Sequence, residues 1–376
     1  MTAVPYRIER LLLPDTLDSP DAGDFLEFSK LSDALVLETW GNLDRATPPG
    51  ARLRYWRDDA YQRMQLFFVR FGGRMVARSW LRCELQDNLG RALIHVDVLN
   101  DFTGRGTGRA LLAHAEALAA ADRRNVLMSF TEHPAGFDAQ GPDLLRPATG
   151  TGALPATARA VRFAQQAGYQ LEQVERLSSL AMPPAPGLLD ALEREALARA
   201  EPYELLTWTG HCPEEYVEQL AVLMSRMSTD APTGGLSYDA ESWDVARVRH
   251  VEDTWKQAGT ISLVTAARHR GRNELAAYSV LELAPGKPWL ADQDDTLVAA
   301  SHRGHRLGML VKIRNLRRLL AEYPAVERVN TFNAEENDHM LSINVALGFR
   351  PAGYDGEWQR TVTLPAGRPS GPYAGH

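Results

Sequence analysis

The chain has 376 residues, which is too long for one ordinary hydrophobic core and suits two domains of roughly 150 to 200 residues each. Hydrophobic residues make up 44% of the sequence and charged residues 24%, a globular composition that excludes disordered, collagen-like and coiled-coil proteins. The net charge of −7 argues against a nucleic-acid-binding protein, because such proteins need a basic face.

Cysteine content and hydropathy narrow the class further. Cys83 and Cys212 lie far apart without a CxxC pair, so we expect neither a disulfide framework nor a metal site. No apolar run approaches the ~18 residues of a membrane span, and the N-terminus lacks an apolar stretch after a basic start. These features predict a cytoplasmic protein without a membrane partner. Scarce lysine beside abundant alanine suggests a bacterial coding bias.

In the first half, a strand, a glycine-rich loop and a helix follow one another. The strand is predicted over residues 91–98, and the loop reads Thr103-Gly104-Arg105-Gly106-Thr107-Gly108. Apolar residues at helical spacing predict a helix over residues 110–124, and a short strand follows at 126–130. A further helix is expected to end at the pair Gly168-Tyr169.

The second half repeats this order. Residues 289–298 are predicted as a strand, and the following loop reads His302-Arg303-Gly304-His305-Arg306-Leu307-Gly308. A helix is predicted over residues 310–320 and a strand over 328–332, and the Gly-aromatic pair is Gly348-Phe349. The chain therefore contains the same supersecondary unit twice.

The breaker Met182-Pro183-Pro184-Ala185-Pro186-Gly187 separates the two copies. We predict a first domain over residues 1–184, a linker and helix over 185–202, a second domain over 203–364 and a disordered tail over 365–376. In the first copy, the Gly/Pro-rich stretch 133–155 is expected to form an ordered cover or a flexible loop.

A glycine-rich turn that enters a helix presents unpaired backbone N–H groups at the positive helix end, and so can bind phosphate. A Rossmann loop would need a third glycine where Arg109 stands, and neither copy has the Gly-Lys-Ser/Thr end of a P-loop. The remaining pattern, Arg/Gln-x-x-Gly-x-Gly/Ala between a strand and a helix, resembles the pyrophosphate loop of the GNAT acyltransferases. Ordinary strand-turn-helix connections are the alternative interpretation.

On these residues the chain resembles a tandem GNAT protein, similar in layout to mycothiol synthase. The resemblance implies an α/β (α+β) fold of two GNAT domains, each a mixed, mostly antiparallel sheet flanked by helices. It also implies that the strand before each loop splays from its neighbour, so that its freed backbone binds the pantetheine arm of acetyl-CoA or another acyl-CoA. The implied donor-binding residues of the loops and strand ends are Val298, Arg303, Gly304, His305, Arg306, Leu307, Gly308, Val98, Thr103, Gly104, Arg105, Gly106, Thr107 and Gly108.

Two positions depart from the loop pattern. Arg306 replaces the middle glycine of the second loop, where it would crowd the phosphates or add a cation to them, and Thr103 replaces the arginine of the first loop. On the helix after the second loop, the basic run Arg314, Arg317 and Arg318 is expected to form a solvated face. The alternative is that Lys312 and Arg314 reach an adenine-side phosphate.

The resemblance also implies that a base on the strand takes the proton of the attacking amine. Strict alternation would place Asp292 and Asp294 on one face together with Val298, so these two carboxylates are the candidate bases. In the first half, the same alternation turns His95 and Asp97 away from Val98 and leaves no base on that face. Solvated strand-edge carboxylates are the alternative for the two aspartates.

Many GNAT enzymes carry a tyrosine acid four residues before the Gly-aromatic pair. Here these positions hold Asn344 and Ala164, so Asn344, alone or with a bound water, is the candidate in the second half. Asn333 and Asn337 are candidates for hydrogen bonds to the pantetheine amides, although Asn337 also suits a helix N-cap.

The sequence analysis thus predicts an N-acyltransferase that moves an acyl group from acyl-CoA to the amine of a small molecule. The second half is expected to carry the chemistry, and the first to bind a thioester without turnover or to shape the acceptor cleft. Two alternatives stay open. The donor would be phosphopantetheine on an acyl carrier protein, or the chain would be a non-catalytic acyl-CoA-binding scaffold.

Overall fold

The computed structural model describes residues 7–138 and 141–364. The predicted tail, residues 365–376, lies outside this range. Within the described residues, no helix is both long and apolar enough to cross a membrane.

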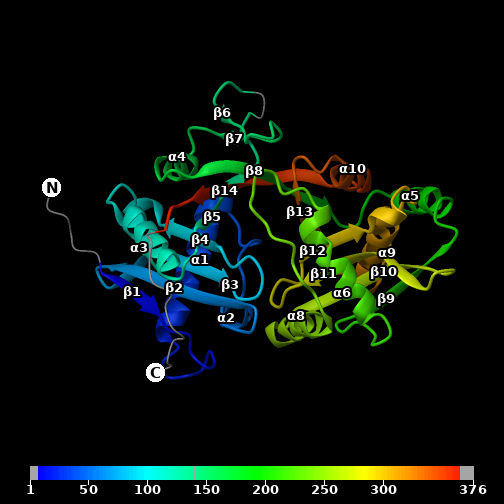
Figure 1. Ribbon diagram of the computed structural model, residues 1–376, viewed down its shortest axis with the longest axis horizontal. Helices are drawn as coiled ribbons and strands as arrows, with labels where there is room; N and C mark the ends of the chain where they lie inside the picture. Colours follow the sequence, from blue (N-terminus) through cyan, green and yellow to red (C-terminus); the bar gives the residue numbers. More distant parts are fainter. Residues whose placement is uncertain (1–6, 139–140, 365–376) are drawn as a thin grey trace.

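One long sheet runs through the whole molecule (Figure 1). The strands contributed by the first half are β1 (Ile8–Leu11), β2 (Gln62–Phe71), β3 (Arg74–Glu84), β4 (Arg91–Val98), β5 (Val126–Pro134) and β8 (Gln170–Ala181). Those contributed by the second half are β9 (Tyr203–Thr209), β10 (Ile261–His269), β11 (Glu274–Leu283), β12 (Leu290–Val298), β13 (Arg328–Ala334) and β14 (Arg350–Thr361). Their spatial order is β1-β2-β3-β4-β5-β14-β8-β13-β12-β11-β10-β9.

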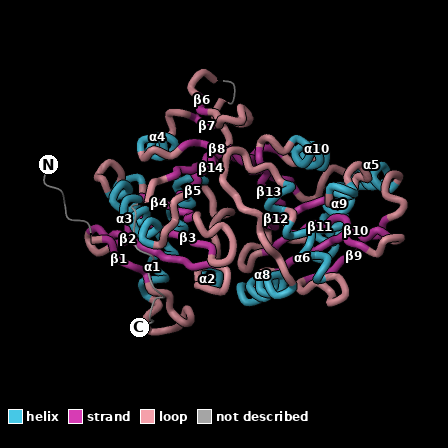
Figure 2. Tube along the Cα trace, in the orientation of Figure 1, coloured by secondary structure: helices cyan, strands magenta, loops and turns pink. Residues whose placement is uncertain are grey.

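Helices gather at both ends of this sheet, and the central strands bridge the two groups (Figure 2). The helices of the first half are α1 (Gly23–Trp40), α2 (Pro49–Tyr55), α3 (Thr107–Ala121) and α4 (Arg159–Gln166). The later helices are α5 (Leu188–Leu197), α6 (Val217–Ser225), α7 (Met227–Asp230), α8 (Val245–Ala258), α9 (Leu307–Glu322) and α10 (Asp338–Leu347).

The two halves exchange their last strands. β14, from the end of the chain, pairs with β5 of the first half, and β8, from the first half, pairs with β13 of the second. β8 and β14 also pair with each other, which joins the two sheets into one. Each half therefore completes its sheet with a strand that the other half supplies, so the division into residues 1–184 and 203–364 follows the sequence repeat but does not separate two independent sheets.

Each half packs apolar helix faces on both sides of its strands. In the second half, α9 buries Leu310, Ile313 and Leu316 against one face, while α6 and α8 cover the other face around Tyr278. In the first half, α3 covers one face and α1 the other. We name the two sheet faces of the second half the α9 face and the α8 face.

The predicted mixed, mostly antiparallel sheet is confirmed. The only parallel pairs among the described strands are β4 with β5 and β12 with β13, each joined by a glycine loop and a helix. The Gly/Pro-rich stretch 133–155 carries the small hairpin β6 (Leu144–Leu145) and β7 (Leu154–Pro155). Leu154 is buried and touches the position of Gly356 on β14, so this part of the stretch is an ordered cover.

Candidate functional site

Both parallel strand pairs splay apart. The β12–β13 ladder begins at Leu290 and Arg328 and ends at Gln293 and Thr331, so β12 continues to Val298 without a partner on this side. In the first half, the β4–β5 ladder similarly ends where Leu93 pairs with Met128. A splayed pair leaves backbone N–H and C=O groups without ladder partners, and these groups are available to a ligand with amide groups of its own.

A glycine loop closes the open end of each splayed pair. In the second half, a turn of 3-10 helix over Ala300–His302 leads to Gly304 and Arg306, whose φ angles of +89° and +59° are left-handed. Arg306 is the N-cap of α9, so the first N–H groups of that helix lie at the loop without intrahelical partners. The first loop has the same backbone, with φ of +73° at Gly104 and +85° at Gly106. Both loops therefore offer an anion-binding backbone.

The loops lie tightly against their strands. A Cβ on Gly308 would be 3.5 Å from Val298 Cγ2 and 3.2 Å from Ile343 Cδ1, and one on Gly108 would be 3.4 Å from Val98 Cγ2. Glycine at these positions thus brings the start of the helix close to the end of the strand and keeps the loop short.

Arg306 directs its charge to a neighbouring helix. Its Nη2 donates to Glu195 Oε1 on α5 at 2.5 Å, and the side chain is exposed. The backbone of Arg306 nevertheless repeats the left-handed conformation of Gly106, so the substitution does not change the path of the loop.

The other loop side chains are largely engaged with the protein. Arg303 donates from Nη2 to Asp230 Oδ2 at 3.1 Å, and His305 Nδ1 lies 3.1 Å from the carbonyl oxygen of Arg199. Thr103 Oγ1 and Arg105 Nη2 donate to the main-chain carbonyls of the preceding turn. Thr107 and Leu307 are buried at the helix starts. Any phosphate at these loops would therefore contact mainly backbone N–H groups.

A β-bulge reorders the side chains of β12. Thr296 pairs with Ser279 and Gln293 pairs with Leu281, so Asp294 and Asp295 together stand opposite the single residue Val280. The extra residue reverses the alternation, which the strict period of two did not anticipate. The prediction that Asp292 and Asp294 share a face with Val298 is therefore wrong.

The bulge instead collects three carboxylates on the α8 face. Val298 packs with the α9 cluster, whereas Asp292 pairs with Glu282, Asp294 hydrogen-bonds Glu282, and Asp295 accepts from Tyr278 Oη at 2.9 Å. Asp295, which the sequence analysis did not select, thus joins the two predicted aspartates. A β-bulge has no clear signature in the sequence, so no local signal identified it.

These carboxyls favour the protonated form more than free carboxyls do. Partial burial raises the pKa of Asp292, and loss of solvent around the carboxyl raises the pKa of Asp294 even though this residue as a whole is exposed. Partial burial together with the charge of Asp294 raises the pKa of Asp295 to about 7. The pKa of Glu282 is raised well above its ordinary value by burial and the neighbouring carboxylates, so Glu282 keeps its proton and donates to Asp294. The cluster is therefore able to take up a proton near neutral pH.

The first half forms the other wall around these carboxylates. Tyr55 of α2 hydrogen-bonds Thr260 Oγ1 at 2.9 Å, and its pKa is raised by burial and by the nearby charge of Asp294. The segment before α2 supplies Arg45, which with Lys287 lowers the pKa of Asp292 against the effect of burial. Both halves therefore contribute to this side of the site.

A chain of three polar side chains crosses the α9 side of the splayed pair. Lys312 of α9 is 2% exposed, and its Nζ donates to Asn344 Oδ1 at 3.0 Å. Asn344 Nδ2 in turn donates to Asn333 Oδ1 at 2.6 Å, two residues beyond the end of the β12–β13 ladder. Lys312 therefore points into the core rather than outward to an adenine-side phosphate, whereas Arg314 is exposed as expected.

Asn337 serves as a helix cap. Its Oδ1 accepts from the backbone N–H of Met340 at 3.2 Å at the start of α10. The alternative interpretation of Asn337 as an N-cap is thus the one that the geometry supports, since the cap uses its side-chain oxygen.

On β4 of the first half, His95 and Asp97 stand where β12 of the second half carries its carboxylates. His95 Nε2 lies 2.9 Å from Asp97 Oδ2, Arg78 also contacts Asp97 at 2.8 Å, and the His95 ring is stacked between Trp80 and Phe130. Burial raises the pKa of Asp97, but the charges of His95 and Arg78 outweigh it and hold that pKa below its ordinary value.

His95 and Asp97 do turn away from Val98, as alternation predicts, since Arg78 beside them bonds to Ser32 of α1 while Val98 packs on α3. The reason for excluding a base there does not hold, however. In the second half the carboxylates also face away from the valine, so the His95 side of β4 is the counterpart of the α8 face.

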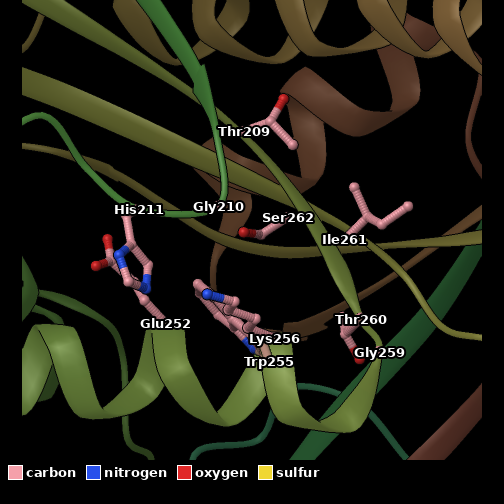
Figure 3. A pocket seen from close by; sticks show the side chains of 10 residues that line it. All are labelled: Thr209, Gly210, His211, Glu252, Trp255, Lys256, Gly259, Thr260, Ile261 and Ser262. Atoms are coloured by element: carbon pink, nitrogen blue, oxygen red, sulfur yellow. The ribbon is translucent and has the colours of Figure 1, made fainter.

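A cavity of about 400 Å³ opens on the α8 face, between α8 and the ends of β9 and β10 (Figure 3). Trp255 and Lys256 of α8 line it, together with Ser262, whose buried Oγ has no hydrogen-bond partner in the described part of the chain. Ser262 pairs with Glu282, and Glu282 pairs with Asp292. The cavity and the carboxylates therefore lie on one face of the sheet, roughly 10 Å apart.

Comparison with known proteins identifies the fold. No protein-family model and no curated protein matches the sequence. Among solved structures, the chain is similar to a tandem GNAT protein from the clavulanic acid biosynthesis pathway, with 25% identity and a TM-score of 0.70 over 95% of this chain and 98% of that one. A GCN5-related N-acetyltransferase from Sphaerobacter thermophilus shares the fold at 11% identity and a TM-score of 0.59, over 95% of each chain.

A third similar fold is the GCN5-related glucosamine N-acetyltransferase region of a fungal multi-domain GH3 β-N-acetylglucosaminidase, at 12% identity and a TM-score of 0.58. It covers 95% of this chain and 38% of that one. The repeated strand-loop-helix unit, the two splayed strand pairs and the full-length structural match agree. The chain has the fold of a tandem GNAT protein.

Proposed function

We propose that the second half transfers an acyl group from an acyl-CoA to the amine of a small molecule. The observation that carries this proposal is the arrangement around β12: an anion-binding loop at its end, unpaired backbone along its splayed part, and three carboxylates on the face opposite α9. A donor and an acceptor would thus approach β12 from opposite sides.

The donor side fits a nucleotide thioester by its own geometry. The left-handed Gly304 and Arg306 and the free helix start suit a pyrophosphate, and the unpaired β12 backbone up to Val298 suits the amide groups of a pantetheine arm. When bound, acyl-CoA would supply the activated acyl carbon. The protein groups assigned to holding it are the loop from Arg303 to Gly308, Val298 and Asn333.

The acceptor side fits an amine. Asp292, Asp294 and Asp295 would attract an ammonium group and take its proton, and raised pKa values bring them nearer to the pKa of a useful base at neutral pH. The unpartnered Oγ of Ser262 gives the nearby cavity one polar group for the distal part of an acceptor.

The two alternatives for the donor differ in what they require of the loop. A carrier-protein donor would not need a pyrophosphate site, which would leave the loop free to carry Arg306 in place of the middle glycine. Because Arg306 keeps the backbone of Gly106 and pairs with Glu195, the loop retains a free helix start, which favours acyl-CoA. The first half would then bind a second thioester or serve as the acceptor wall.

Calorimetry with CoA tests the donor assignment. Gly308→Glu places an anion where phosphate is expected, and should weaken CoA binding at least tenfold, or ~1.4 kcal/mol. Gly308→Ala is the matched control, because it adds the same Cβ beside Ile343 without the charge.

An unchanged affinity in Gly308→Glu, together with a loss in Gly108→Glu, would assign the donor to the first half. Thiol release with a panel of amines then distinguishes an enzyme from a scaffold. Binding of CoA without release of thiol for any amine would support the non-catalytic alternative.

A further inference from the structure

Lys312 is an unusual residue for the core of a domain. It is 2% exposed, and in residues 7–138 and 141–364 no carboxylate pairs with it. Its neighbours are the Asn344 amide and the ring of Phe349, whose centroid is 5.9 Å from Nζ. An ammonium group has three N–H donors, and only one hydrogen bond is formed here. Burying such a cation costs free energy unless a partner arrives.

The first half provides an internal comparison. Gly108 and Gly308 correspond, so Leu112 occupies the position of Lys312, and Ala164 occupies that of Asn344. Both residues of the first half are apolar and buried. The fold therefore does not require a lysine or an amide at these positions, and the polar chain belongs to the second half alone.

The lysine determines how the Asn344 amide is oriented. An ammonium group can only donate, so Lys312 requires the carbonyl oxygen of Asn344 and turns the NH2 group toward Asn333. One N–H of that group is used by Asn333 Oδ1. The second N–H remains for a group held between β12 and β13, where the ladder has ended at Gln293 and Thr331.

We propose that Lys312 is a positioning residue, which orients the Asn344 amide and places a positive charge behind it so that the pair stabilises the thiolate leaving an acyl-CoA. This inference rests on the proposed function. In the transfer, the amine nitrogen bonds to the acyl carbon, the carbon–sulfur bond breaks, and its electron pair stays on sulfur. The amine proton goes to the carboxylates of β12, and the sulfur takes a proton from water after release.

The energetics agree with this role. Burial lowers the pKa of Lys312 to about 7, so the charged form exists at neutral pH but lacks a counter-charge. A thiolate in the splayed pair would supply that charge. Thiol pKa values fall when a lysine lies nearby.

The test measures the thiol pKa of CoA bound to the protein, by thiolate ultraviolet absorbance against pH. A free thiol titrates near ~8.5, and we expect the bound thiol to titrate at least about one unit lower, a tenfold change in acidity. Lys312→Leu and Asn344→Ala, which copy the first half, should each return the value to that of free CoA. Lys30→Leu removes an exposed lysine of α1 and is the control that should change nothing.

The outcomes separate this inference from the proposed function. If CoA does not bind, the proposed function fails. If CoA binds and Gly308→Glu abolishes binding, but the bound thiol titrates like free CoA or is insensitive to Lys312→Leu, only the role of Lys312 is overturned. Removing an unpaired buried charge should not unfold the protein. If Lys312→Leu nevertheless fails to fold, the thiol pKa of CoA bound to the wild type and to Asn344→Ala still tests whether this pair stabilises the thiolate.

Discussion

Asp295 is expected to reduce the stability of the protein above neutral pH. Its carboxylate is partly buried beside Asp294 and accepts a hydrogen bond from the fully buried Tyr278, and its pKa rises from 3.8 to about 7 on folding. The folded state thus binds a proton more tightly than the unfolded state. The free energy of unfolding should therefore fall as pH rises from about 4 to about 7 and level off above.

Asp295→Asn removes this ionisation and keeps an oxygen that accepts from Tyr278. A pKa difference of about three units corresponds to a ceiling of about 4 kcal/mol, and coupling to Asp294 reduces the expected gain to roughly 2 kcal/mol at about pH 8. The gain should vanish below about pH 3, where the carboxyl is protonated in both states because the pH lies below the unfolded pKa of 3.8.

Urea unfolding at several pH values measures this difference. Asp18→Asn, at an exposed position in the loop before α1, is the control and should change stability little at any pH. A variant at position 295 that is equally stable or less stable than wild type near pH 8 would refute the burial of a carboxylate at the bulge. So would a gain that does not depend on pH.

Three further predictions concern the loop, the exchanged strands and the carboxylates. Arg306→Gly should raise the free energy of unfolding in urea slightly, by up to about 1 kcal/mol, because it relieves a left-handed arginine and loses only an exposed ion pair. A clear loss of stability would contradict this. Gly356 lies on the exchanged strand β14, and Gly356→Ala would place a Cβ 2.4 Å from Leu154 Cδ1. This overpacking should cost about 1–3 kcal/mol of stability, measured in one calorimetric transition that both halves share. Two separate transitions would show that the exchange does not couple the halves. Asp294→Asn should keep the affinity for CoA but slow acyl transfer about 10²-fold near neutral pH. The effect should be smaller toward pH ~10, because the amine is then already deprotonated. A loss of rate that is equal at all pH values would exclude a role of Asp294 as base.

The local pattern of the sequence was sufficient for the repeated unit. The glycines at 104, 108, 304 and 308, the apolar period of the following helices and the two Gly-aromatic pairs predicted β4, α3, β12 and α9 close to their observed bounds. This succeeded because turns, caps and amphipathic faces depend on residues near one another in the chain.

Three decisive features of the site depend instead on contacts between distant segments. The exchange of β8 and β14 pairs segments that lie far apart in the chain, so no local pattern specifies it. The bulge at Asp294 and Asp295 changes the register by one residue and so moves Asp292 and Asp294 to the face opposite Val298, beside Asp295.

The burial of Lys312 also depends on contacts between distant segments. The sequence placed this lysine beside the basic run of α9, within reach of an adenine-side phosphate, because charged residues are rarely buried without a partner. Only the packing of α9 against β13 and α10 brings Asn344 within 3.0 Å and closes the core around the lysine. The sequence by itself therefore determined the two GNAT units and their loops. The tertiary structure decided which side chains face the space between the splayed strands, because that depends on register and packing across more than one element.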